Sequence, residues 1–190
     1  MKDAIRQDVL KRRQACSADD QQQAAALLAG QLVPWLAANY PPSDVVVIAG
    51  YAACRGELDV WPLMQDLFVK NYQLALPCVE QPNAALMFRH WQPQDSLAEG
   101  AYNIKQPEVS APIVMPTLLL VPLVAADIKR RRIGYGGGYY DRTIHQLKQS
   151  NPALVTIGIA HDFQLLDSVP SEAHDVSLDH LFTPTKHISG

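Results

Sequence analysis

Short apolar runs alternate with helical segments along this chain of 190 residues, and this alternation constrains the fold more than any other feature. Runs typical of buried strands occupy residues 44–50, 73–77, 117–126 and 154–160, and residues 84–91 alternate partly, as expected of an edge strand. Strands that alternate with helices build a mostly parallel sheet that helices cover on both faces. We therefore predict an α/β fold with three αβα layers and a Rossmann-like sheet, in which ligands bind beyond the carboxyl ends of the strands.

Three segments have apolar side chains at helical spacing: residues 2–15, 58–70 and 139–149. Another helix is expected to begin after Ser17, whose hydroxyl is a suitable N-cap, and Pro34 is expected to kink or end that helix. Residues 92–112 are polar and rich in proline, so we expect a long loop there.

The composition narrows the class of protein. Hydrophobic residues make up 48% and charged residues 18%, which argues against disorder, and the length suits a single domain over residues 1–190. The net charge of −3 argues against a general nucleic-acid binder. No run approaches the roughly 18 uncharged apolar residues of a spanning helix, and the charged N-terminus argues against a secretory signal. Cys16, Cys54 and Cys78 form no metal or redox motif, so we expect a cytoplasmic protein with reduced thiols.

A cluster of glycines occupies the segment Ile133–Asp141, which reads IGYGGGYYD. The cluster precedes the predicted helix 139–149 and follows the basic run Lys129–Arg132. Glycines allow close backbone approach, and backbone N–H groups at a helix N-terminus attract anions. The neighbouring cationic side chains can pair with phosphate oxygens. These features indicate a phosphate cradle, and the alternative is a flexible surface turn beside a solvated basic run.

Several polar and aromatic side chains are candidates for binding a ligand or a metal. Asp141 lies in the first turn of the helix after the glycines, where it could complement the helix dipole or, beside a phosphate, hold Mg²⁺. Asp175 could complement it at the same cation. Glu57 follows the first predicted strand and could accept hydrogen bonds from ligand N–H groups, or serve only as an N-terminal helix charge. Trp91 could stack on a flat heterocycle or pack in the core.

With these motifs, the chain resembles the 5-formyltetrahydrofolate cyclo-ligase family over nearly its whole length. The likeness is centred on Asp127–Arg142, DIKRRRIGYGGGYYDR, which is close to the family's D-x-x-G-x-R-L-G-Y-G-G-G-Y-Y-D-R. Weaker matches occur in the family's order at Lys2 and Arg6, at Gly56–Asp59, from Phe88 to Pro107, and from Pro170 through His174 to Asp179.

The resemblance implies an ATP-dependent C–N ligase that converts 5-formyltetrahydrofolate to 5,10-methenyltetrahydrofolate and releases ADP and phosphate. It implies ATP as co-substrate and Mg²⁺ as cofactor. In the implied reaction the formyl oxygen is phosphorylated and the substrate's own N10 attacks, so no catalytic nucleophile of the protein is expected. We expect a monomer whose partner is this small molecule, with or without a polyglutamate tail, and expect neither nucleic acid nor membrane as a partner.

The resemblance also assigns site residues by family position. The expected ATP contacts are Lys2, Arg6, Arg132, Ile133, Gly134, Tyr135, Gly136, Gly137, Gly138, Tyr139 and Tyr140. Ala52 and Glu57 are expected to line the folate site, where we also expect Trp91. Asp141 and Asp175 are expected to hold magnesium.

The chain departs from the family pattern at a few positions. Ala126 and Arg130 replace a usual Phe and Gly, and Tyr102-Asn103 replaces a usual Phe-Gly where the folate pocket is expected. Two alternatives therefore remain: a non-catalytic folate- or nucleotide-binding protein, and a sugar-phosphate enzyme on a similar fold. The presence of both Asp141 and Asp175 favours the cyclo-ligase over a binding protein, because binding alone needs no pair of metal ligands.

Overall fold

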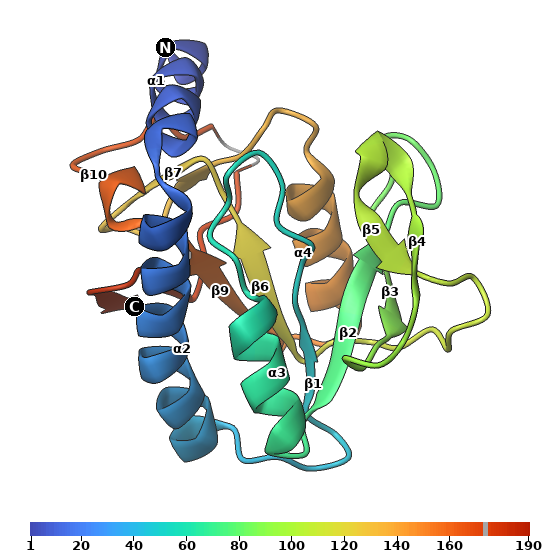
Figure 1. The fold of residues 1–190 in the computed structure, drawn as a ribbon. Coiled ribbons are helices and arrows are strands. Elements are labelled where there is room, and N and C mark those ends of the chain that lie inside the picture. Colours follow the sequence, from blue (N-terminus) through green and yellow to red (C-terminus); the bar gives the residue numbers. More distant parts are fainter. Residues whose placement is uncertain (173–174) are drawn as a thin grey trace.

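A mixed sheet forms the centre of the computed structural model, which describes residues 1–172 and 175–190 (Figure 1). In the described part its seven strands, in spatial order, are β12 (His187–Ser189), β11 (His180–Phe182), β9 (Val155–Ile159), β6 (Leu118–Pro122), β1 (Val47–Ala49), β2 (Gln73–Cys78) and β3 (Met87–His90). The five inner strands run parallel, and β3 and β12 add antiparallel edges. The predicted α/β fold with a mostly parallel sheet is confirmed. His174 lies outside the described residues.

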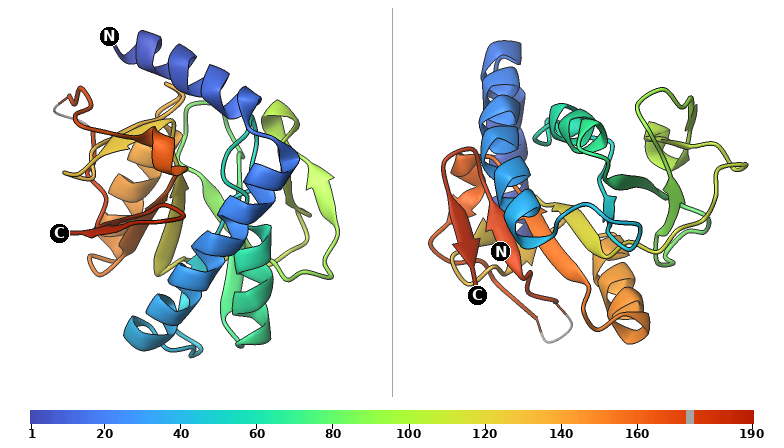
Figure 2. Two further views of the ribbon diagram at one scale, coloured as in Figure 1. Left: turned by 60° about the vertical axis from the view of Figure 1, so that its left-hand side comes forward. Right: turned by 90° about the horizontal axis from the view of Figure 1, so that it is seen from below.

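Helices cover both faces of this sheet, as the view from below makes clear (Figure 2). Over the described ranges they are α1 (Lys2–Ala15), α2 (Ala18–Asn39), α3 (Trp61–Val69) and α4 (Tyr139–Ser150), with short 3₁₀ turns η1 (Ala101–Asn103) and η2 (Asp162–Gln164). Successive strand residues point to opposite faces. Ile48 therefore packs with α2 and α3, whereas Ala49 packs with α4. None of these helices is long and apolar enough to cross a membrane.

The segment 92–112 contains two strands, so the prediction of one long loop is wrong. Strands β4 (Leu97–Glu99) and β5 (Lys105–Pro107) pair as an antiparallel hairpin. Their side chains are mostly half-buried or exposed, so the sequence lacks the apolar alternation that marks a strand with one face in the core.

The apolar run 117–126 is divided between two sheets, whereas the sequence predicts one strand. Strand β6 ends at Pro122, and β7 (Ala125–Asp127) pairs with β8 (Arg132–Ile133) and β10 (Leu165–Leu166) instead. Both pieces are buried, mostly completely, so hydrophobicity does not reveal the break between them. This break matters for the site, because it turns the chain out of the main sheet just before the glycine cluster.

A local hydrogen-bond pattern starts helix α2, whereas burial of apolar side chains lets the helix continue past Pro34. The Ser17 hydroxyl accepts the backbone N–H of Asp20 at 3.1 Å, and the Asp20 carboxylate accepts the backbone N–H of Ser17 at 3.1 Å, which confirms the predicted N-cap. Pro34 does not end the helix, which continues to Asn39. Leu32 and Leu36 on either side of it are fully buried, and this packing outweighs the backbone hydrogen bond that proline cannot make.

Replacing Ser17 with alanine removes the acceptor for the Asp20 backbone N–H at the start of α2. We expect the free energy of unfolding, measured by urea denaturation, to fall by about 1 kcal/mol. Ser96 is an exposed serine directly before β4, so the control Ser96→Ala is expected to change the free energy of unfolding by less than about 0.5 kcal/mol. Equal losses in the two variants would show that the Ser17 cap does not stabilise the helix.

Candidate active site

A cavity of about 1600 Å³ opens at the carboxyl ends of the central parallel strands. Tyr51 and Ala52 follow β1, Val79 follows β2, and Pro122 ends β6, and all four residues line the cavity. The carboxyl ends of parallel strands meet at one edge of a sheet, which is where the α/β fold class places its ligands. The location of the cavity therefore agrees with the location predicted from the sequence.

The glycine cluster forms one wall of this cavity, and every residue from Arg132 to Arg142 lines it. Gly136 has φ +97° and Gly138 has φ +65°, a left-handed region in which side chains other than glycine are strained. Gly138 is also the N-cap residue of α4, and no side chain caps that helix end. The loop thus presents backbone groups and the positive end of a twelve-residue helix to the cavity, an arrangement that suits an anion.

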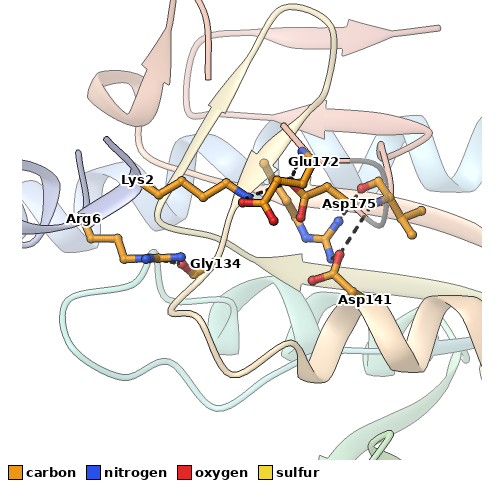
Figure 3. A network of polar contacts seen from close by, with 8 residues as sticks. Lys2, Arg6, Gly134, Asp141, Glu172 and Asp175 are labelled. Atoms are coloured by element: carbon orange, nitrogen blue, oxygen red, sulfur yellow. Dashed lines mark hydrogen bonds and ion pairs between the residues drawn. The ribbon is translucent and has the colours of Figure 1, made fainter. Parts of the chain in front are cut away.

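Helix α1 brings two cations to the same wall, as Figure 3 shows. The Arg6 guanidinium donates through Nε to the Gly134 carbonyl at 2.8 Å, so α1 is attached directly to the glycine loop. The Lys2 ammonium lies 2.8 Å from Asp175 and 2.9 Å from Glu172. Hydrogen bonds to these two carboxylates raise the pKa of Lys2. Segments that lie more than 120 positions apart in the sequence therefore come together at this wall of the cavity.

Asp141 and Asp175 both line the cavity, and each contacts a cation of the protein. The Asp141 carboxylate accepts a hydrogen bond from Arg132 at 2.6 Å, and Arg132 also donates to the Val176 carbonyl at 2.5 Å. The described residues contain no group of three or more side chains typical of a metal centre. Two carboxylates from separate segments nevertheless fit Mg²⁺, which typically takes one or two carboxylates and completes its shell with phosphate oxygens and water.

Glu57 lies on the wall formed by the loop after β1 and is 6% exposed. Its Oε2 atom accepts the backbone N–H of Cys54 at 2.9 Å. Burial raises the pKa of the Glu57 carboxyl, although the Cys54 N–H, the Arg13 charge and the Tyr135 hydroxyl oppose that rise. Burial likewise raises the pKa of Cys54 to about 11, so its thiol is neutral at physiological pH. Glu57 therefore presents a largely buried carboxylate to the cavity, with the Cys54 N–H as its backbone donor.

The structure does not place Trp91 at this cavity, and its predicted contact with substrate is corrected. Trp91 is 4% exposed and packs in the core, where its ring centroid lies 4.9 Å from that of Trp61. It directly follows β3, and its backbone N–H pairs with Leu74 of β2, which holds it on the α2 and α3 side of the sheet. The alternative reading of Trp91, packing in the core, is the one that the structure supports.

The basic run beside the glycines contributes only its last member to the cavity. Arg132 lines it, whereas Lys129, Arg130 and Arg131 do not. Arg130 donates to the carbonyls of Leu178 and Ser189, and Arg131 pairs with the buried Asp127. Arg130 and Arg131 therefore bind other parts of the protein and do not line the cavity.

Sequence reasoning overlooked part of the opposite wall, which comes from the β4–β5 hairpin. Tyr102, Ile104 and Gln106 line the cavity there. The Tyr102 hydroxyl lies 2.9 Å from that of Tyr139, so the hairpin reaches the glycine loop across the cavity. The sequence places the departure Tyr102-Asn103 where the folate pocket is expected, but it predicts a loop there and assigns none of these side chains a contact with ligand.

Comparison with known proteins agrees with this geometry. A model of the 5-formyltetrahydrofolate cyclo-ligase family matches residues 1–184. The 5-formyltetrahydrofolate cyclo-ligase of Escherichia coli K12 is 32% identical over 186 residues, which cover 94% of this chain and 97% of that protein. The enzyme of the same name from Haemophilus influenzae is 32% identical over 136 residues, which cover 69% of this chain and 72% of its own.

Two solved structures resemble the fold. The 5,10-methenyltetrahydrofolate synthetase of Aquifex aeolicus superimposes with a TM-score of 0.81 at 28% identity, covering 99% of this chain and 92% of its own. That of Mycoplasma pneumoniae gives a TM-score of 0.75 at 24% identity, with 96% and 98% covered, and supports the fold alone. With the family model matching 184 of its 190 residues, this chain belongs to the 5-formyltetrahydrofolate cyclo-ligase family.

Proposed function

We propose that this chain converts 5-formyltetrahydrofolate to 5,10-methenyltetrahydrofolate in a reaction that consumes ATP, requires Mg²⁺ and releases ADP and phosphate. One observation carries the proposal: a helix with two cations, a glycine loop and a buried carboxylate converge on a single cavity in a member of the cyclo-ligase family. The cavity of about 1600 Å³ exceeds the roughly 300–1000 Å³ of a typical single-ligand pocket. A cavity of that size favours the binding of two substrates side by side and argues against a site for one small phosphate ester.

The glycine loop and α1 are proposed to bind the triphosphate of ATP. The backbone from Arg132 to Tyr140 supplies N–H donors, and the N-terminus of α4 supplies a partial positive charge. Lys2 and Arg6 add full charges from α1. Lys2 is already paired with Asp175, so ATP binding would exchange this contact for one with phosphate.

Asp141 and Asp175 are proposed to hold Mg²⁺, which when bound neutralises charge on the transferred phosphoryl group. At present Asp141 pairs with Arg132 and Asp175 pairs with Lys2. The partly exposed Lys2 side chain can rotate away from a metal, whereas the buried Arg132 is also held by the Val176 carbonyl.

The proposed chemistry needs positioning more than it needs a reactive side chain. A formamide carbonyl is a poor electrophile, because its nitrogen donates electrons into it. Transfer of the γ-phosphoryl group to the formyl oxygen makes that oxygen a leaving group, and attack by N10 of the folate followed by loss of phosphate forms the methenyl bridge. The nucleophile belongs to the substrate, so the protein contributes orientation and electrostatic stabilisation.

Glu57 and Ala52 are proposed to line the folate side, with the β4–β5 hairpin opposite. The buried Glu57 carboxylate is a strong acceptor for the N–H groups of a pterin ring. The unusual Tyr102 belongs to this side of the cavity, so the hairpin carries the part of the site that is particular to this chain.

A single domain over residues 1–190 is also proposed, and the apolar clusters on both faces of the main sheet support it.

Mixing the purified protein with 5-formyltetrahydrofolate, ATP and Mg²⁺ is expected to produce the methenyl chromophore, followed as rising near-ultraviolet absorbance. Omitting ATP, or chelating Mg²⁺ with EDTA, is expected to abolish the rise, because phosphorylation of the formyl oxygen is required before ring closure. A rate no greater than that of the enzyme-free mixture would reject the proposed function.

Asp141→Asn keeps the shape of the side chain and removes its charge. We expect turnover to fall at least about tenfold, because the metal loses a charged ligand, while the free energy of unfolding falls by only about 1–2 kcal/mol, because the asparagine Oδ1 still accepts from the buried Arg132. The matched control Asp66→Asn, at an exposed position on α3, is expected to change neither quantity. A parallel loss of stability and turnover in Asp141→Asn would instead indicate that the residue only supports the helix end.

Glu57→Gln replaces the charged carboxylate acceptor proposed for the folate ring with a neutral amide. We expect the KM for 5-formyltetrahydrofolate to rise about tenfold or more, since a charged hydrogen bond contributes about 1.5–3 kcal/mol, and the KM for ATP to change little. The pKa of Glu57 lies above its ordinary value, so in the unaltered protein folate binding should weaken as the pH falls through that raised pKa. The variant should lose this pH dependence. An equal rise in both KM values would place Glu57 elsewhere.

A further inference from the structure

Arg13, near the C-terminal end of α1, is a buried cation with no role in the proposed chemistry. It is 2% exposed, and one of its nitrogens, Nη1, donates to the Tyr135 hydroxyl at 2.5 Å. Nη2 donates to the carbonyl of Leu123, just beyond β6, and Nε is buried without a hydrogen-bond partner among the described residues. A buried charge that is not fully paired costs stability, so an anchor for α1 alone is a poor explanation for it.

The contacts of Arg13 lead to Glu57 by two routes. In the first, the Tyr135 oxygen accepts from Arg13, which leaves the Tyr135 proton for the Glu57 carboxylate that it faces. In the second, a Cβ on Gly56 would stand 3.0 Å from the Cβ of Arg13, so α1 packs directly against the backbone of the loop that carries Glu57. Gly56 has φ +72°, a conformation that this close packing and the neighbouring turn require of glycine.

Tyr135 is held on its ring as well as at its hydroxyl. The guanidinium carbons of Arg13 and Arg55 lie 5.9 Å and 5.3 Å from the ring centroid, within the range of cation–π attraction. Tyr135 belongs to the glycine loop, which Arg6 of the same helix also contacts through Gly134. Helix α1 therefore contacts two successive residues of the proposed ATP wall, and the second of them, Tyr135, also faces Glu57 on the proposed folate wall.

We infer that Arg13 is a positioning residue: through Tyr135 it holds the Glu57 carboxylate in the orientation that receives the N–H groups of the folate ring. The inference rests on the proposed function. Arg13 does not touch the substrate in this arrangement and acts only through Tyr135 and the Gly56 backbone. It follows that α1, which carries Lys2 and Arg6, ties the geometry of the nucleotide side to that of the folate side.

The groups around Glu57 make its ionisation a suitable readout. Those that face it are Arg13 from α1, Tyr51 and Cys54 from its own loop, Tyr135 from the glycine loop and Tyr140 from α4. Burial raises the pKa of the three phenols and of the thiol, so they stay neutral in acid, and arginine stays charged. Removal of the Arg13 charge should therefore raise the pKa of Glu57 further.

Arg13→Met keeps most of the buried stem and removes the guanidinium. We expect kcat/KM for 5-formyltetrahydrofolate to fall about ten- to a hundredfold, mainly through KM, with its acid limb shifted to higher pH and the KM for ATP changed less than about twofold. Arg13→Lys, which keeps the charge without the two-pronged donor, should restore the position of the acid limb in part. Lys11→Met, on the exposed face of the same helix, is the control and should match the parent protein.

Two further measurements separate positioning from a merely structural role. Titration of ¹³C-labelled glutamate carboxyls, with the Glu57 signal identified by its loss in Glu57→Gln, should show a higher Glu57 pKa in Arg13→Met without reference to activity. The same variant also distinguishes Glu57 from the buried His161, whose pKa is lowered by burial. In the Glu57→Gln background, Arg13→Met should cause little further loss, because both changes act on one interaction.

The inference would be overturned if the Glu57 pKa were unchanged in folded Arg13→Met. It would also be overturned if Arg13→Met lowered kcat/KM as much in the Glu57→Gln background as in the parent protein. If Arg13→Met does not fold, Tyr135→Phe decides, because it removes only the hydroxyl between the two groups. An unchanged folate KM and acid limb in Tyr135→Phe would also overturn it. The two proposals fail differently: an inactive parent protein rejects the cyclo-ligase function, whereas an active parent with unaffected variants rejects the role of Arg13.

Discussion

The attachment of α1 to the glycine loop is the interaction on which the rest of the site depends. Arg6 holds the Gly134 carbonyl and Arg13 holds the Tyr135 hydroxyl, so one helix fixes two successive residues of the loop. The loop can follow this path only because Gly136 and Gly138 adopt positive φ. With the loop fixed, the N-terminus of α4 points into the cavity and its backbone donors need no rearrangement to receive an anion.

The charged side chains at this site pair with one another within the protein. Lys2 pairs with Asp175 and Glu172, and Arg132 pairs with Asp141. Under the proposed function, the cations would turn to phosphate and the carboxylates to Mg²⁺ when a metal–nucleotide complex binds. Such a complex brings both charges at once, so it would suit this arrangement better than phosphate or metal alone.

The proposed folate side relies on burial in place of exposed charge. Glu57 is almost enclosed, and the groups that face it are neutral phenols, a thiol, one backbone donor and the cation Arg13. In such surroundings a carboxylate is a strong acceptor, but its orientation must be held by its neighbours, because a small displacement leaves a buried charge without a partner. The loop after β1 contributes the Cys54 N–H to that task, and under our inference the glycine loop and α1 share it.

The sequence alone determined the elements whose signal is local. Apolar runs located β1, β2 and β9, and helical spacing located α1 with its correct ends. The order of the glycines marked the glycine loop, and this motif resembles that of one family. Sequence did not separate β6 from β7, did not reveal the β4–β5 hairpin, and misplaced Trp91, because each depends on partners distant in the chain. Only the tertiary structure decided that Arg132 faces the cavity while Arg130 and Arg131 turn away, and that Arg13 of α1 reaches the Tyr135 hydroxyl. The physical reason is that a residue's type fixes which contacts it can make, whereas the packing of separate segments fixes which of those contacts are within reach.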